Sequence, residues 1–173
     1  MRFILFCAAL LPLCFVVSCS RDYRGFEDGS GRFSVDYPRT WDIKPGSQTG
    51  VAVTFESRME GFDDDFPENF SVTAGDIPAG LTEESFAKAA AEAPKAYIPK
   101  FRLLSQEPFS KGKYPAFRVV YSGELAGSEL MWEQYFFVRK GMGYSVIFTI
   151  SAKKIDAYRP AIDHVVQSFR IRN

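Results

Sequence analysis

The chain is poor in the residues that metal sites, disulfides and catalytic sites most often use. It has three cysteines, Cys7, Cys14 and Cys19, and one histidine, His164, among 173 residues. If the N-terminal segment is cleaved, no pair of cysteines remains to form a disulfide or a thiolate metal site. The sequence also shows no convergent set of nucleophile, base and metal ligands. We therefore expect no catalytic residue, no metal and no cofactor, in a protein that is not an enzyme.

The chain also lacks net charge. Lys and Arg together number 21, and so do Asp and Glu, which gives a formal net charge of zero. A neutral chain has no overall field to attract a phosphate backbone, and we expect no nucleic-acid partner. Hydrophobic residues at 46% and aromatic residues at 16% are enough for the core of one domain.

The apolar N-terminal segment is too short for an ordinary membrane span. The uncharged run from Phe3 to Val17 has fifteen residues and contains Pro12, whereas a spanning helix needs about 20. Arg2 precedes the run and small residues follow it. This layout is typical of a cleaved signal peptide, which we place at residues 1–18.

The cysteines indicate which kind of signal peptide this is. Cys7 and Cys14 follow bulky residues, whereas Cys19 follows Ser18. The segment VVSC, ending at Cys19, resembles the lipobox of bacterial lipoproteins, with Val16 where that family usually has Leu. The resemblance implies that Cys19 carries diacylglycerol and a further acyl chain such as palmitate, which together anchor the protein to a membrane. The alternatives are a secreted soluble protein cleaved nearby and a weak membrane-anchor helix.

The segment after Cys19 is polar, contains glycines and shows no hydrophobic period. It predicts a flexible tether over residues 19–30, followed by a single domain over residues 31–173. In a host with two membranes, Ser20 after the lipidated cysteine is typical of an outer-membrane lipoprotein that faces the periplasm.

The domain begins with apolar residues that alternate with polar ones, which predicts strands. Three such segments are centred on Val35, Val53 and Val72, and four further strands are expected near 101–108, 114–122, 129–139 and 144–151. The last two strands are apolar on both faces, so both faces of the sheet must be covered. Short Gly-bearing connections imply antiparallel neighbours.

Two segments have helical periodicity. The first follows Thr82, a plausible N-cap, and its predicted apolar stripe comprises Phe86, Ala89, Ala90 and Ala93. The second lies near 156–169, with a stripe formed by Ile155, Tyr158, Ile162, Val165, Val166 and Phe169. The sequence therefore predicts an α+β fold, with an antiparallel sheet of six to seven strands flanked by helices.

Three groups of polar residues invite a functional interpretation. His164, Ser168 and Asp163 could suggest a hydrolytic triad, but Asp163 points about 100° around the helix from His164, which favours a solvated histidine. Glu129 and Glu133 share one face of a strand but lie about 13 Å apart, too far for paired-carboxylate catalysis. We expect them to pair with Arg118 or Arg139 across the sheet.

The third group is an acidic loop, Asp63–Asp65, flanked by Glu60 and Glu68. Several carboxylates could hold a hard cation, but the spacing lacks the pattern of an EF-hand, and a solvated loop is the default expectation. Five aromatic residues lie in or near predicted loops, and core packing is the expected role for most of them: Trp41, Phe62, Phe66, Tyr97 and Phe109.

Four features of the domain occur in a characteristic order: the opening FSVDYPRTW, the helix after the third strand, the segment KGKYPAFRVVY and the closing VVQSF. In these features the domain resembles the PsbP-like, or Mog/PsbP, superfamily. The resemblance implies an α/β/α sandwich, a mostly non-enzymatic superfamily, and relatives among bacterial lipoproteins of the DcrB type. It transfers no functional residue.

These observations lead to one main hypothesis and one alternative. We expect a lipid-anchored, extracytoplasmic, non-catalytic domain in the cell envelope that acts through protein–protein contacts, as an accessory subunit of an envelope complex. Its partners would be the membrane, through the lipid on Cys19, and an envelope protein that the sequence does not identify. The alternative is a binding or carrier protein for an apolar small molecule or lipid.

Overall fold

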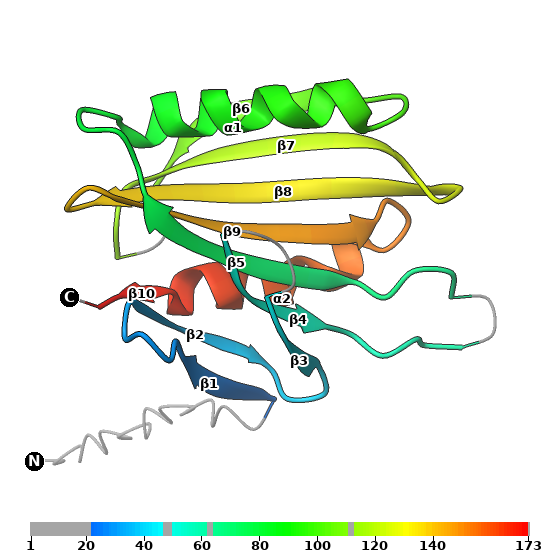
Figure 1. Ribbon diagram of the computed structural model, residues 1–173. Helices are drawn as coiled ribbons and strands as arrows, with labels where there is room; N and C mark the ends of the chain where they lie inside the picture. The colour runs from blue at the N-terminus through cyan, green and yellow to red at the C-terminus, as the bar shows by residue number, and fades with distance from the viewer. Residues whose placement is uncertain (1–21, 47–49, 62–63, 111–112, 173) are drawn as a thin grey trace, which may run out of the picture.

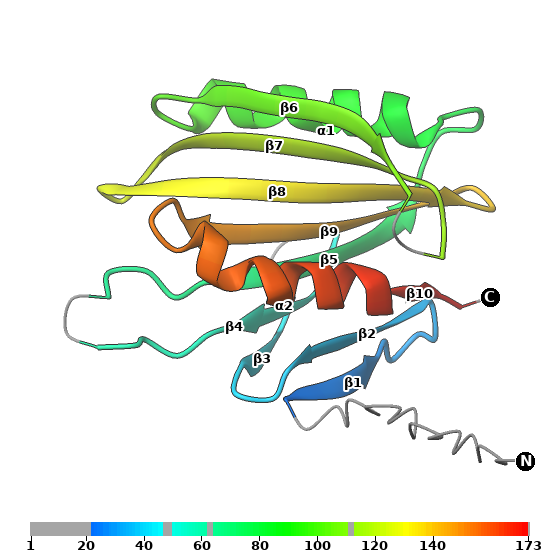
Figure 2. The ribbon, with the colours of Figure 1, turned by 180° about the vertical axis from the view of Figure 1, so that it is seen from behind.

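The computed structural model describes residues 22–46, 50–61, 64–110 and 113–172. Their elements form three layers (Figures 1 and 2). Helix α1 (Glu83–Tyr97) covers one face of a central sheet, while helix α2 (Ile155–Ser168) and a small second sheet cover the other. The predicted α+β class is confirmed. Within these four ranges, no helix has the length and apolar character needed to cross a bilayer.

The central sheet has seven strands, all antiparallel to their neighbours. In spatial order they are β3 (Asp42–Pro45), β4 (Val51–Glu56), β5 (Asn69–Asp76), β9 (Met142–Ser151), β8 (Ser128–Arg139), β7 (Ala116–Leu125) and β6 (Arg102–Phe109). All six strands predicted after residue 50 are present. The alternation of apolar and polar residues identified them because one face of each strand packs on a core.

The middle strands are apolar on both faces because a hydrophobic core lies on each side. The core under α2 is dominated by aromatic rings, and Phe55 stacks on Phe70 with ring centroids 4.5 Å apart. The core under α1 includes Trp132 stacked on Tyr121 at 5.3 Å. The two stacks fix the register of neighbouring strands from opposite faces.

The second sheet contains β1 (Tyr23–Glu27), β2 (Phe33–Pro38) and β10 (Arg170–Ile171), in the order β1-β2-β10. The prediction of a flexible tether over residues 19–30 is wrong for β1. This strand pairs with β2 along its whole length, and Phe26 packs edge-on against Phe55 at 5.3 Å. A short polar segment becomes a strand here because a partner strand holds it and because the partly buried ring of Phe26 packs on the core. Cys19 lies outside the described residues.

Helix α1 begins where the sequence predicts. Thr82 is the N-cap, and its Oγ1 accepts a hydrogen bond from the Ser85 backbone N–H at 3.2 Å. In return, the Thr82 backbone N–H donates a hydrogen bond to Oγ of Ser85. The predicted apolar stripe is right for Phe86 and Ala90, which are partly buried against the core, and wrong for Ala89 and Ala93. The buried residues are Ala87, Ala91 and Pro94, whereas Ala89 and Ala93 are exposed.

Helix α2 presents the predicted stripe to the sheet. Ile162, Val165 and Val166 are buried, and Phe169 follows directly after the helix in the same core. The helix contacts both β2 and β9, so it joins the second sheet to the central one.

Candidate functional site

His164 does not take part in a triad. Its Nε2 lies 3.3 Å from Oδ2 of Asp36, and its ring stacks on Tyr23 with centroids 3.7 Å apart. The Oγ of Ser168 instead accepts a hydrogen bond from the Asp36 backbone N–H and donates one to the carbonyl oxygen of Val165. His164 is therefore a contact between α2 and the β1–β2 hairpin, and not the freely solvated side chain that the sequence predicts.

Glu133 is the most deeply buried member of an ion network that follows β6, β7, β8 and α2. Its side chain is 1% exposed, and it accepts hydrogen bonds from Nε of Arg118 at 2.8 Å, from Nη1 of Arg159 at 2.9 Å and from the hydroxyl of Tyr135. Nη1 of Arg118 also bonds to Glu107 at 2.7 Å. Burial alone would raise the pKa of Glu133, but the hydrogen bonds from Arg118 and Tyr135 outweigh it and hold the pKa below its ordinary value.

The predicted pairing of the two glutamates is confirmed for one of them. Glu133 pairs with Arg118, as expected. Glu129 pairs with neither Arg118 nor Arg139, because Arg102 reaches it from β6 with Nη2 3.2 Å from Oε1. The sequence could not reveal this pair, because it depends on which strand lies beyond β7.

The acidic loop converges on a lysine. Nζ of Lys154 lies 2.7 Å from Oδ1 of Asp64, 3.2 Å from Oε2 of Glu60 and 3.4 Å from Oε2 of Glu68. Among the residues that the structure describes, no group of three potential ligand side chains has the arrangement of a metal site. The ammonium group of Lys154 thus supplies the counter-charge in this cluster, and Asp63 lies outside the described residues.

Most loop aromatics pack into the fold, as expected. Trp41 is buried against Phe70 and Tyr158, and Phe66 and Phe109 pack against the two cores. Tyr97 differs, because it lies at the end of α1 with 69% of its surface exposed. Phe62 lies outside the described residues.

Tyr97 belongs to a group of exposed apolar side chains that sequence reasoning missed. Six large hydrophobic residues are exposed among those described, and four come from one corner of the molecule: Tyr97, Leu103, Leu104 and Leu125. They lie at the end of α1, the start of β6 and the end of β7. We call these four residues the corner patch. A patch rimmed by charges is typical of a protein-binding surface.

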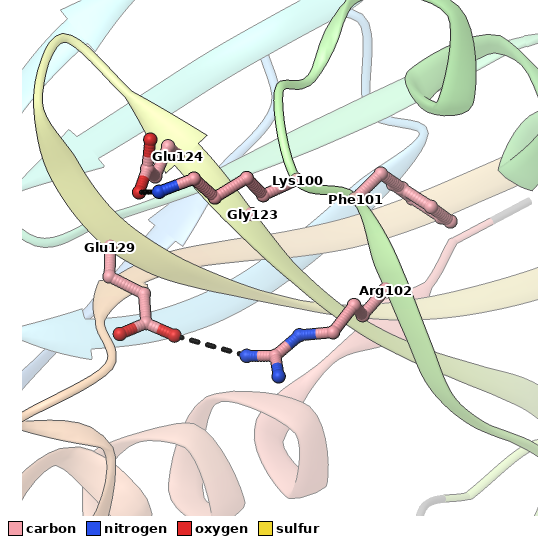
Figure 3. Close-up of a pocket in the computed structure, with 6 residues that line it drawn as sticks. All are labelled: Lys100, Phe101, Arg102, Gly123, Glu124 and Glu129. Atoms are coloured by element: carbon pink, nitrogen blue, oxygen red, sulfur yellow. Dashed lines mark hydrogen bonds and ion pairs between the residues drawn. The ribbon is translucent and has the colours of Figure 1, made fainter.

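A groove of about 410 Å³ lies beside the corner patch (Figure 3). Its walls carry two ion pairs, Lys100 with Glu124 and Arg102 with Glu129. The lining residues are Lys100, Phe101, Arg102, Gly123, Glu124 and Glu129. The groove therefore offers opposite charges in close alternation, which suits a polar protein surface better than an apolar ligand.

Gly123 shapes this groove because it lets the segment after α1 cross closely over β7. A Cβ atom at this position would lie 2.3 Å from Cγ2 of Ile98 and 2.9 Å from the carbonyl oxygen of Pro99. The same crossing is fixed by a hydrogen bond of 2.8 Å from the Glu124 backbone N–H to Pro99. The groove and the start of β6 are therefore held by a close backbone contact.

The corner patch also borders a free strand edge. Among the residues that the structure describes, β6 is the last strand of the central sheet and no further strand pairs with its outer side. Its register against β7 shifts between Leu103 and Ser105, so Leu104 forms a bulge. The site thus combines an open edge, exposed leucines and paired charges, and its chemistry is that of binding.

A second groove, of about 580 Å³, lies between the start of β1 and the first half of α2. Trp41 and Tyr158 line it together with Arg39, Glu60 and Lys154. Its wall is mixed, because part of the Lys154 cluster lies beside apolar side chains of α2 such as Ala157 and Ala161.

No protein-family model matches the chain, and no curated protein matches it by sequence. Its fold does match solved structures. The cyanobacterial PsbP (CyanoP) of Synechocystis sp. PCC 6803 aligns over 91% of this chain and 96% of its own, with a TM-score of 0.65 and 19% identity.

Two further structures have the same fold. LpqN of Mycobacterium tuberculosis covers 87% of this chain and 91% of its own, with a TM-score of 0.61 and 13% identity. The Ran-binding protein Mog1p of Saccharomyces cerevisiae covers 86% and 95%, with a TM-score of 0.59 and 10% identity. At these identities the likeness concerns the fold alone. The chain therefore has the fold shared by PsbP and Mog1p, as the sequence resemblance implied.

Proposed function

We propose that the protein is a lipid-anchored, extracytoplasmic, non-catalytic domain that works through protein–protein contacts, as an accessory subunit of an envelope complex. The observation that carries this proposal is the corner patch beside the free edge of β6. Exposed leucines and a tyrosine, surrounded by Arg and Glu, have the composition of a binding surface, with an apolar centre and a polar rim.

The position of the anchor supports this use of the corner patch. β1 lies at the end of the molecule opposite α1 and β6 in both views (Figures 1 and 2). The four peptide units from Cys19 to Tyr23 span at most about 14 Å when fully extended. A lipid on Cys19 would hold β1 close to the bilayer, and the corner patch would stay clear of the anchor.

Two of the similar structures support a binding role in the envelope. LpqN is involved in cell envelope biogenesis, and Mog1p is a Ran-binding protein. A protein with this fold can therefore act through contact with another protein. In the present chain, His164 is engaged with Asp36 and Tyr23, which favours a structural role for the residue most often used as a catalytic base.

A photo-crosslinking amino acid at Leu104 tests the proposal. In cells that produce the protein naturally, we expect a discrete adduct from this position. Ile43 is the matched control, because it is a similarly exposed apolar residue on β3, at the opposite edge of the sheet. The proposal fails if Leu104 gives no adduct, or gives the same adducts as Ile43.

The alternative, an apolar carrier, makes a different prediction. A carrier would retain its ligand during purification, and native mass spectrometry would show the added mass. The groove beside the corner patch is bordered by four charged side chains, which favours protein contacts over an apolar cargo at that place.

A further inference from the structure

We propose that β6 pairs with β6 of a second copy of this chain, antiparallel about a two-fold axis between Leu104 and Ser105. This proposal rests on the proposed function, because it identifies the protein that binds the edge of β6 as a second copy of this chain. Two central sheets would then join into one continuous sheet across the edge that β6 leaves open.

The first argument is the position of two charges on β6. Arg102 faces Ser122 and Glu107 faces Arg118 in the register with β7. Ser122 and Arg118 are four residues apart on one strand, so Arg102 and Glu107 share a face of the sheet. In the proposed register, Arg102 lies directly opposite Glu107 of the second copy, and the two-fold axis makes this pair twice.

The second argument is that these pairs would complete a ladder of alternating charge. Within one copy, Arg159 bonds to Glu133, Glu133 to Arg118, and Arg118 to Glu107. In the second copy the ladder would continue from Arg102 to Glu129, which the structure already pairs at 3.2 Å. Arg102 is 69% and Glu107 54% exposed, so each can accept another partner. A self-complementary pattern of this kind is what a two-fold interface requires.

The third argument is the placement of the exposed leucines, the bulge and the proline of β6 relative to the two-fold axis. Leu103 and Leu104, both exposed, lie beside the axis, and the dimer would bring four leucines together there. The bulge at Leu104 falls at the axis, so both copies carry it at the same place. Pro108, which has no N–H to donate, lies beyond the last facing pair, because the register uses only residues 102–107.

The arrangement is compatible with anchoring both copies in one bilayer. A two-fold axis between neighbouring antiparallel strands runs perpendicular to the sheet, so the α2 faces of both copies point the same way. β2, the partner of β1, packs in the core on that face together with α2. Both N-terminal segments would therefore leave from the same face of the joined sheet, one toward each of its two ends, because β1 lies opposite β6 in each copy.

Charge reversal tests the register directly in the full-length protein, purified in detergent and measured by native mass spectrometry. Arg102→Glu alone and Glu107→Arg alone each convert two attractive pairs into two repulsive ones, and each should weaken association at least about tenfold. An equimolar mixture of the two variants should form a heterodimer, because every facing pair is again of opposite sign. Mixing the two variants cannot correct misfolding of either chain. Formation of the heterodimer would therefore report on the interface alone.

The control is Lys44→Glu, which reverses a charge on the opposite edge strand, β3, and should leave the dimer intact. A wild-type protein that stays monomeric at micromolar concentration overturns the proposed dimer. Dimers that survive both single reversals overturn the register. If the protein is monomeric but Leu104 still crosslinks another envelope protein, the edge binds a different partner and the proposed function stands; without that crosslink, both proposals fail.

Discussion

Replacing Glu133 with Gln should destabilise the protein more than the same change at an exposed glutamate of the sheet. Gln keeps the size of the side chain but removes the charge that Arg118 and Arg159 share. The carboxylate is 1% exposed, so solvent cannot substitute for it. Two guanidinium groups would be left without their main counter-charge.

The magnitude follows from the burial of the partners. Removing one member of a buried ion pair costs about 3–5 kcal/mol. Arg159 is 37% exposed and Arg118 retains its bond to Glu107, so both can recover some solvation or pairing. We therefore expect a loss of about 3 kcal/mol in the free energy of unfolding, or about 6–12 °C in Tm for a domain of this size.

The effect should depend on pH in a defined direction. The pKa of Glu133 is lowered in the folded protein, relative to about 4.3 in an unfolded chain. Its contribution to stability is therefore complete above about pH 4.3 and is lost as the pH falls through the folded-state pKa. The stability difference between wild type and Glu133→Gln should be largest at neutral pH and should shrink on acidification below about pH 4.

Urea unfolding of purified protein, followed by circular dichroism, measures both effects. Glu129→Gln is the control, because Glu129 lies on the same face of β8 but is 58% exposed, and it should change stability by less than about 0.5 kcal/mol. A Glu133→Gln variant that matches this control, or that keeps the same deficit from pH 7 to pH 3, would show that the buried ion network does not act as described.

Three further changes have defined outcomes. Gly123→Ala should lower the free energy of unfolding in urea by about 1–3 kcal/mol, because its Cβ would lie 2.3 Å from Cγ2 of Ile98. The control Gly29→Ala has open space around the new Cβ and should be nearly neutral. Lys154→Met should cost about 3 kcal/mol in urea unfolding at neutral pH, since three carboxylates lose their shared cation. The cost should be smaller in acid, because the hydrogen bond from Lys154 lowers the pKa of Asp64 and its contribution is lost as the pH falls through that pKa; a deficit unchanged by acidification would contradict this. Cys19→Ser should move the protein from the membrane fraction to the soluble fraction, as an immunoblot would show, and unchanged membrane retention would argue against lipidation.

Local patterns were enough to predict the central strands, the N-cap at Thr82 and the apolar stripe of α2. Each depends on the spacing of neighbours along the chain, and spacing is a property of the sequence. The stripe of α1 shows the limit of this reasoning. Several alanines follow one another in that helix, so more than one face is apolar, and packing against Phe117 and Val119 in the core below decides which face is buried.

Sequence alone also determined that β8 and β9 need cover on both faces, and it predicted Arg118 or Arg139 as the partner of Glu133. It could not determine that Tyr23–Glu27 is a strand, that Glu133 is buried while Glu129 is exposed, or that β6 ends the sheet beside four exposed apolar residues. These features arise from contacts between segments far apart in the chain, such as Phe26 with Phe55 and Arg159 with Glu133. Only tertiary structure sets the order of strands, and with it which edge and which charges remain available to a partner.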